Sequence, residues 1–448
     1  MIDFEELKAE LIKAAAAAGI EQYEIYYQLI RDASAETLGE ELSGFSFGVS
    51  GGICFRCIMG GRMGYAATEL MNSGEMRELV IRALENSKQI ENDDEVFIYP
   101  GSPKYGQKTR EADVFPDAAL LKNNALALQR NTYAKSNYVA DGTQSQVFAF
   151  ETETRICNSM GLNLKNTAGA TSGYTRAVVK VDGESADDYD FTLGCELDRL
   201  LPLSERAVAG ALAKIGAGEI DSGKYDVIID GRQMQSLLAA FSSVFSGKSA
   251  RLGLSLLAGK EGCEVASPCI TITDDPFDPN CPMQTTFDAE GVAVYTKNVI
   301  EKGVLKTLLY DLTNAKKAGV ESTGNASKGN YASTVGISPF CFSIRPGEYS
   351  LEQLFEMVSD GLYVTEIKGL HAGANHATGD FSVECAGFLV EGGRRGRPIK
   401  SFTIAGNFYG LLRSITHVGN KVEYGIPTGF TVFASPAVLV RNISAAGK

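Results

Sequence analysis

The stretch Gly369-Leu-His-Ala-Gly-Ala-Asn-His-Ala-Thr-Gly-Asp-Phe-Ser382 is the densest polar segment of this 448-residue chain. It contains two of the only three histidines, and glycines separate its polar residues. Glycine allows backbone amides and carbonyls to approach a ligand, while Asn, Thr, Asp and Ser side chains offer hydrogen bonds. The glycines favour a loop over a helix. The stretch therefore predicts a loop that holds the best candidate site of the chain.

Six polar side chains of this loop are candidate binding residues. They are His371, Asn375, His376, Thr378, Asp380 and Ser382. A plainer interpretation is that these side chains hydrogen-bond to their own backbone, as Asn, Asp, Ser and Thr commonly do in loops. The residues by themselves leave both interpretations open.

Metal binding and nucleophilic catalysis are two further hypotheses for the loop. His371 and His376 make an incomplete zinc ligand set, which Asp380 or Cys385 could complete only if the loop folded back suitably. A metal-free hydrolase would use His376, Asp380 and Ser382, but their order matches no recognised nucleophile, base and acid arrangement. We therefore expect no metal in this chain.

Composition excludes several other classes of protein. The net charge is −13 and the basic residues form no stripe, which argues against direct nucleic-acid binding. The nine cysteines are scattered without the framework of a disulfide scaffold, as expected for a reducing compartment. The first ten residues are acid-rich, and the alanine run at 14–18 is too short to span a membrane. We expect a cytoplasmic protein without membrane contact.

The hydrophobic pattern predicts an α+β protein with more than one domain. Phe4, Leu7, Leu11 and Ala15 recur at helical spacing after a capping Asp3, and β-rich stretches follow. Gly and Pro punctuation places boundaries near 90–112 and 217–224. We expect a helix-plus-antiparallel-sheet domain at 1–100, a β-rich middle domain at 112–217 and a mostly β domain at 224–448.

Two motif-like patterns are given structural interpretations. Cys54 and Cys57 have redox or zinc-type spacing, but they lie in a predicted strand, where residues three apart point to opposite faces. Gly247-Lys248-Ser249 is like the end of a phosphate-binding loop, yet it lacks the earlier glycine and follows a predicted helix at 234–245. Neither pattern predicts a functional site.

The loop at 369–382, followed by Gly387-Phe-Leu-Val-Glu391 and Ile404-Ala-Gly-Asn407, closely resembles the carboxy-terminal domain of the TldD/PmbA (TldE) family. Phe287-Asp-Ala-Glu-Gly-Val292 and Gly60-Gly-Arg-Met-Gly64 carry the resemblance into the rest of the chain. The resemblance implies the family's α+β fold.

The family's TldD-like members carry a zinc helix with the pattern H-E-x-x-x-H and a cysteine ligand near the carboxy terminus. The matching positions here are Ala239, Ala240 and Val244, with Val418 at the third ligand. None of these side chains can bind zinc or move a proton. The chain therefore resembles the PmbA/TldE branch, and we expect it not to be catalytic alone.

The resemblance implies a heterodimer with a TldD-like subunit, which would carry the zinc and cleave unfolded peptides. In this interpretation the six loop residues help to bind the peptide backbone. A homodimer is expected when the chain is alone. The family's older name, modulator of DNA gyrase, suggests an alternative: a protein that binds gyrase or an antitoxin without a peptidase partner.

Overall fold

The computed structural model describes residues 3–90 and 95–447; most of the predicted connection at 91–95 therefore lies outside the described residues. The N-terminal part contains α1 (Phe4–Ala17), β1 (Gln22–Leu38), β2 (Glu41–Met59), β3 (Arg62–Thr68), α2 (Ser73–Gln89), α3 (Ala118–Ala134), β4 (Gln144–Asn158), β5 (Asn163–Val181), β6 (Glu184–Leu193) and α4 (Leu197–Ala213). Its strands form one antiparallel sheet in the order β3-β2-β1-β4-β5-β6. Strand β1 pairs with β2 and β4, so the predicted ranges 1–100 and 112–217 share a single sheet.

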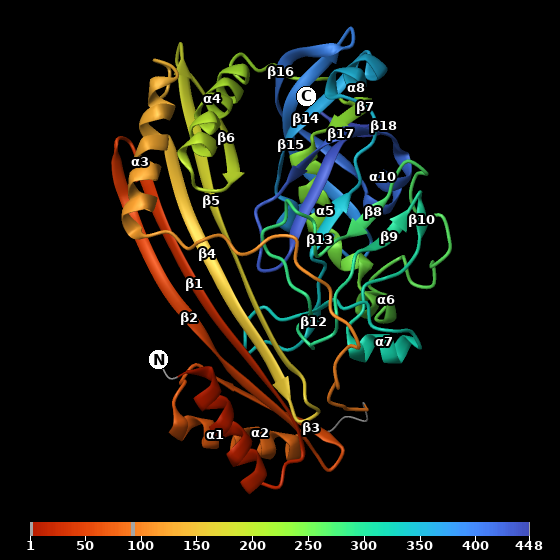
Figure 1. The fold of residues 1–448 in the computed structure, drawn as a ribbon. Helices are drawn as coiled ribbons and strands as arrows, with labels where there is room; N and C mark the ends of the chain where they lie inside the picture. The colour runs from red at the N-terminus through yellow and green to blue at the C-terminus, as the bar shows by residue number, and fades with distance from the viewer. Residues whose placement is uncertain (1–2, 91–94, 448) are drawn as a thin grey trace.

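Helices cover the two ends of this long sheet (Figure 1). At one end α1 and α2 pack their apolar faces with strand residues such as Ile25 and Phe55. At the other end α3 and α4 pack against the sheet through residues such as Leu121 and Leu203. The predicted apolar face of α1 is confirmed, since Phe4, Leu7, Leu11 and Ala15 are all buried. Asp3 precedes the helix, but its side chain makes no capping hydrogen bond, contrary to the prediction.

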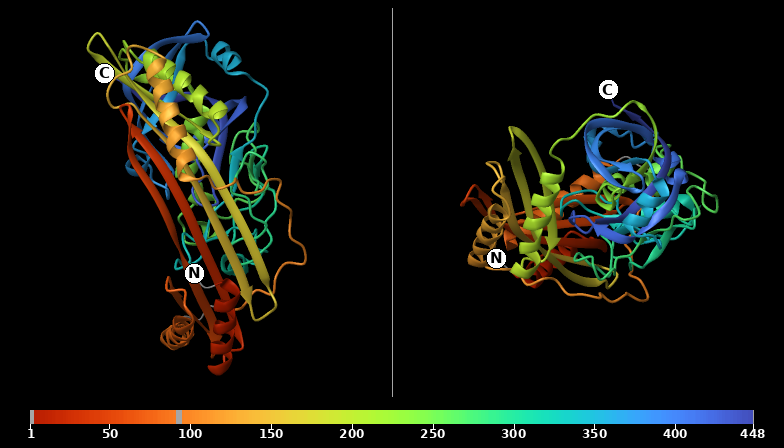
Figure 2. Two further views of the ribbon diagram at one scale, coloured as in Figure 1. Left: turned by 60° about the vertical axis from the view of Figure 1, so that its left-hand side comes forward. Right: turned by 90° about the horizontal axis from the view of Figure 1, so that it is seen from above.

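The C-terminal part contains β7 (Gly223–Ile229), α5 (Gly231–Ala240), η1 (Ser242–Phe245), α6 (Gly247–Arg251), β8 (Ile272–Asp274), β9 (Lys297–Glu301), β10 (Val304–Leu305), α7 (Leu312–Ala318), β11 (Ala326–Ser327), β12 (Gly336–Ile337), β13 (Cys341–Ile344), α8 (Leu351–Val358), β14 (Gly361–Lys368), α9 (Leu370–Gly373), β15 (Asp380–Glu391), β16 (Arg394–Asn407), α10 (Phe408–Ser414), β17 (Ile415–Tyr424) and β18 (Val432–Ala446). Strands β7, β14, β15, β16 and β18 pair in that order, and β18 also pairs with β7. This closes a ring of strands, which the right-hand view of Figure 2 shows from above.

One large apolar cluster fills the C-terminal part. Phe241, Phe245, Phe342 and Phe408 are among its fully buried side chains. The predicted helix at 234–245 is wrong in one respect, because α5 ends at Ala240 and the chain continues through the 3-10 turn η1. The turn brings Phe245 under Phe342, with ring centroids 5.1 Å apart.

The C-terminal part packs against one face of the long sheet. The Tyr65 hydroxyl donates to the carbonyls of Tyr331 (3.3 Å) and Ser333 (3.0 Å). Gly52 is required on the sheet side, because a Cβ there would lie 2.5 Å from the Tyr331 ring. The structural interpretation of Cys54 and Cys57 is confirmed: both are buried free thiols, and they belong to apolar clusters on different sides of β2.

Candidate functional site

The polar loop lines an open cleft of about 810 Å³ in the C-terminal part. The loop side of the cleft is formed by residues 372–377 and 380–382, and the opposite side by Ser243, Ser249 and Leu254. Four of the six predicted binding residues line it: Asn375, His376, Asp380 and Ser382. His371, on the exposed helix α9, and Thr378 do not line it.

The loop is closed by hydrogen bonds of its own. The Asn375 Oδ1 accepts from the backbone N–H of Ala377 (3.0 Å) and Thr378 (3.2 Å). The backbone N–H of Asn375 donates to the Asp380 carbonyl, and that of Gly379 to the Asn375 carbonyl, both at 2.8 Å. The Asn375 side chain therefore hydrogen-bonds to its own loop backbone, as the plainer interpretation predicted, and the same residue also lines the cleft. Its side-chain oxygen shapes the loop.

Asn407, at the end of β16, ties the loop to the strand ring. Its Nδ2 donates to the Thr378 carbonyl (2.8 Å) and to the Asp380 Oδ1 (2.9 Å). The hydrogen bond from Asn407, followed by the one from Thr378, lowers the pKa of Asp380 below its usual value. Gly379 between them has φ +81°, and a Cβ there would lie 2.6 Å from the Tyr409 ring. The exposed Asp380 is therefore held as a carboxylate at the cleft.

Aromatic rings from the C-terminal core lie beneath the cleft. Phe241 stacks on Phe408 with centroids 4.7 Å apart, and its ring contacts the His376 ring edge-on at 5.9 Å. His376 thus lies between the exposed cleft and the apolar core. Among the described residues it makes no hydrogen bond to Asp380 or Ser382. The hydrogen bonds that would link these three side chains as nucleophile, base and acid are therefore not present among the described residues.

The positions that the family resemblance matches to the zinc ligands and the glutamate are part of the apolar packing. Val244 is 1% exposed and Val418 is 2% exposed, and both belong to the core cluster that Ala240 packs against. Ala239 lies half-buried beside Ala240 at the end of α5. Apolar side chains offer no lone pair to a metal, so these residues do not fit zinc.

The third histidine, His417, lies on β17 next to Val418. Its Nδ1 is 3.1 Å from the Thr416 Oγ1, and its ring packs edge-on against Tyr349. Burial, followed by the nearby Arg441 charge, lowers the pKa of His417. Across residues 3–90 and 95–447, no three His, Cys, Asp or Glu side chains gather in a way that could hold a metal ion.

Sequence reasoning missed the residues that face the loop across the cleft. Ser243 belongs to η1 and lies between Ala240 and Val244, two of the positions that match the zinc motif, and that adjacency was the available signal. Ser249 and Leu254 follow on α6 and the next turn, where nothing in the sequence indicates contact with residues more than a hundred positions later.

Family models of metallopeptidase domains match both parts of the chain. A model described as the PmbA/TldA metallopeptidase C-terminal domain matches residues 222–447, and one described as PmbA/TldA metallopeptidase domain 1 matches residues 23–87. The chain belongs to the PmbA/TldD family, as its sequence motifs predicted.

Relatives and solved structures cover almost the whole chain. An uncharacterised Methanocaldococcus jannaschii protein is 26% identical over 93% of this chain and 95% of its own. A Haemophilus influenzae protein named metalloprotease PmbA homolog is 25% identical over 87% of this chain and 86% of its own. A Thermotoga maritima protein described as a proposed modulator of a DNA gyrase is 28% identical, with a TM-score of 0.89 over 99% of this chain and 100% of its own.

The same fold recurs at lower identity. TldE from Thermococcus kodakarensis is 24% identical, with a TM-score of 0.89 over 98% of this chain and 100% of its own. The predicted α+β class with a mostly β C-terminal domain is confirmed. Within the described residues, no helix is both long enough and apolar enough to cross a membrane.

Proposed function

We propose that this chain is the non-zinc-binding, TldE/PmbA-like subunit of a TldD–TldE-type metallopeptidase complex, and that it helps to bind and enclose unfolded peptides. The observation that carries the proposal is the apolar character of the zinc positions. In a metallopeptidase, zinc polarises the peptide carbonyl and activates water, and a glutamate serves as general base. Ala240 replaces that glutamate, and Ala239, Val244 and Val418 replace the ligands. Zinc is therefore assigned to a TldD-like partner.

The cleft beside these positions supports a peptide-binding role. Its loop offers the exposed Asp380 carboxylate, the Ser382 hydroxyl and the amide nitrogen of Asn375, whose oxygen alone is used within the loop. An extended peptide presents alternating N–H and C=O groups, and such side chains can bind them with little dependence on sequence. Asn407 and Gly379 fix the loop geometry, so the polar groups are preorganised.

The first experiment measures cleavage of an unfolded peptide and zinc content, for this chain alone and for its mixture with a TldD-like protein from the same cell. We expect cleavage and one zinc per pair only in the mixture. Cleavage or stoichiometric zinc in the chain alone would overturn the assignment of the zinc positions.

Variants test the loop within the pair. Replacing both Asn375 and Asp380 by Ala is expected to reduce cleavage by about tenfold or more, because two polar contacts at roughly 1 kcal/mol each are lost. Pairing and zinc content should stay unchanged. Asn123→Ala, on the exposed side of α3, is the matched control. Cleavage at the wild-type rate by the double variant would remove the loop from the peptide-binding role.

The description of the Thermotoga protein favours one alternative, a gyrase-binding protein that needs no peptidase partner. The acidic net charge of −13 is compatible with protein contact and unfavourable for DNA contact. A binding measurement with purified gyrase separates the two functions. Tight binding to gyrase in the absence of a TldD-like chain, together with no binding to that chain, would replace the peptidase proposal.

A further inference from the structure

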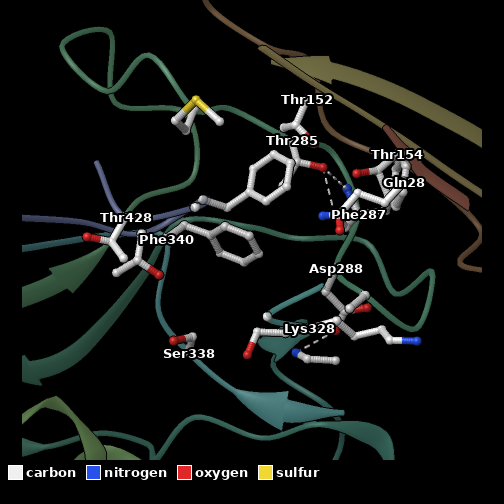
Figure 3. A pocket seen from close by; sticks show the side chains of 18 of the residues that line it. Gln28, Thr152, Thr154, Thr285, Phe287, Asp288, Lys328, Ser338, Phe340 and Thr428 are labelled. Atoms are coloured by element: carbon white, nitrogen blue, oxygen red, sulfur yellow. Dashed lines mark hydrogen bonds between the residues drawn. The ribbon is translucent and has the colours of Figure 1, made fainter. Parts of the chain in front are cut away.

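A second cavity, of about 430 Å³, lies between the long sheet and the C-terminal part (Figure 3). We call it the inter-domain pocket. Strands β1 and β4 form one wall, and loops at 283–289, 326–329, 338–340 and 428–431 form the others. These segments lie far apart in sequence, and no sequence pattern predicted that they form a site. The volume falls in the range of small-molecule sites.

The sheet wall of the inter-domain pocket presents polar atoms without partners. Gln28 of β1 lies opposite Thr154 of β4. Thr152 precedes Thr154 by two residues on β4 and therefore lies on the same face of the sheet. Gln28 is 5% exposed and Thr152 is 6% exposed. Within the described chain the Gln28 Oε1 and the Thr152 Oγ1 have no hydrogen-bond partner. Leaving such a group unsatisfied costs about 1–3 kcal/mol, so these atoms indicate a missing partner.

The other walls of the inter-domain pocket contribute large apolar and aromatic side chains among polar ones. Phe287 is 3% exposed, Phe340 is 6% exposed and Met283 is 1% exposed. Phe430 lies with them, Phe150 of β4 adds a ring from the sheet wall, and hydroxyl side chains such as Thr285 and Thr428 line the rest. A predominantly apolar cavity with a few polar groups on one wall is the usual form of a small-molecule site. The aromatic walls suit a flat or branched apolar body.

The two charged side chains that line the inter-domain pocket, Asp288 and Lys328, have contacts within the protein. The carboxylate of Asp288 accepts the backbone N–H groups of Glu290, Val292 and Ala326 at 2.9–3.0 Å. The Lys328 ammonium lies 4.4 Å from the centre of the Tyr26 ring. The groups that lack a partner, the Gln28 Oε1 and the Thr152 Oγ1, are uncharged. Burying a charged ligand group against them carries a large desolvation cost.

We propose that the inter-domain pocket binds a small uncharged amide with an apolar side chain, such as a capped apolar amino acid or one apolar residue of a peptide. The amide N–H donates to the Gln28 Oε1, and the amide carbonyl accepts from the Thr152 hydroxyl. The apolar side chain packs between Phe287 and Phe340. This inference does not depend on the peptidase role.

The test titrates the full-length protein by calorimetry with N-acetylphenylalaninamide. We expect saturable binding, at least about tenfold tighter than N-acetylphenylalanine, whose carboxylate is costly to bury. N-acetylglycinamide, which lacks the ring, should show no measurable binding. A longer capped peptide with one internal phenylalanine distinguishes the source: binding as tight as the single residue indicates peptide capture, and no binding indicates a free small amide.

Two variants locate the contact. Gln28→Met and Thr152→Val keep side-chain size and remove the polar partner, and each should weaken N-acetylphenylalaninamide by about three- to tenfold. Thr403→Val, on β16 outside the pocket, is the matched control. Absence of saturable binding to the wild-type protein would overturn the proposal, as would tighter binding of the carboxylate. Both of these outcomes are measured on the wild-type protein, so they do not depend on whether a variant folds.

Discussion

The cleft at the polar loop and the inter-domain pocket differ in how their polar groups are satisfied. In the cleft, Asn375 and Asp380 have hydrogen bonds from the loop backbone and from Asn407. In the inter-domain pocket, the Gln28 Oε1 and the Thr152 Oγ1 have none among the described residues. The first site is shaped by its own chain before any ligand arrives, whereas the second has buried groups that a ligand would complete. The most polar segment of the sequence therefore forms a loop whose polar groups are largely hydrogen-bonded, whereas the buried polar groups that lack partners lie elsewhere, in the inter-domain pocket.

The carboxylates of the two sites also differ. Hydrogen bonds lower the pKa of the exposed Asp380, whereas burial raises the pKa of Asp288 to about 7. The neighbouring Glu290 is raised to about 8, first by burial and then by the charge of Asp288. The cleft therefore keeps its negative charge at neutral pH, while the carboxyls beside the inter-domain pocket are close to neutralisation.

The largest expected effect comes from Gly379→Ala, which would break the preformed loop. Alanine at φ +81° is strained, and its Cβ would meet the Tyr409 ring at 2.6 Å. We expect a loss of about 2–4 kcal/mol in the free energy of unfolding, measured by urea denaturation. Binding of N-acetylphenylalaninamide in the folded variant should be unchanged. A loss below about 1 kcal/mol would mean that the loop adapts and is not rigidly preformed.

Asn407→Ala should have the next largest effect, because it removes the link between loop and strand ring. The variant loses the hydrogen bonds to Thr378 and Asp380 and the cap of α10, where the Asn407 Oδ1 accepts from the Tyr409 N–H. We expect a loss of about 2 kcal/mol in unfolding free energy. The Asp380 pKa, followed by carboxyl NMR, should rise toward its ordinary value. An unchanged Asp380 pKa would show that Asn407 does not set its charge; Asn123→Ala is the control.

Local sequence patterns predicted what depends on local physics. The spacing of Phe4, Leu7 and Leu11 gave α1, because one buried helical face repeats every three to four residues. The β-rich pattern that follows α1 does not predict the length of β1, because the strand continues to Leu38 through exposed polar residues such as Asp32. Pairing with β2 and β4 extends it, and that pairing is not encoded locally.

The cleft and the inter-domain pocket show the same limit of prediction from local sequence. Four of the six predicted loop residues line one cleft because they are neighbours in sequence, and glycines bend the chain there. The inter-domain pocket joins two strands to four loops, so its formation depends on docking between distant segments. Gln28 and Thr152 are ordinary strand residues in sequence; only the register and the burial distinguish them.

Raising the pH should weaken the region around the inter-domain pocket and not the cleft. Asp288 and Glu290 have folded pKa values raised above their unfolded values, so the folded state binds more protons and stability falls from about pH 5 to pH 8. Even one pKa unit corresponds to about 1.4 kcal/mol, so we expect a loss of at least about 1 kcal/mol.

Chemical denaturation at several pH values measures this dependence. Glu290→Gln keeps an acceptor for the Leu312 N–H and removes one titrating group, so its dependence should be shallower. Asp380, with a lowered folded pKa, contributes stability that is lost only as the pH falls into the acid range. A wild-type stability that rises between pH 5 and pH 8 would contradict the protonation assigned to the buried carboxyls.

The smallest expected effect is the most discriminating one. Thr152→Val exchanges a buried hydroxyl that has no partner in the described part of the chain for a methyl group of similar size. Because no hydrogen bond is lost, the ligand-free protein should be unchanged or more stable by up to about 1 kcal/mol, measured by urea denaturation. The same variant should bind N-acetylphenylalaninamide more weakly, so stability and affinity move in opposite directions. A stability loss of about 1 kcal/mol would instead assign the hydroxyl a partner such as an ordered water, and the contrast between the two sites would then disappear.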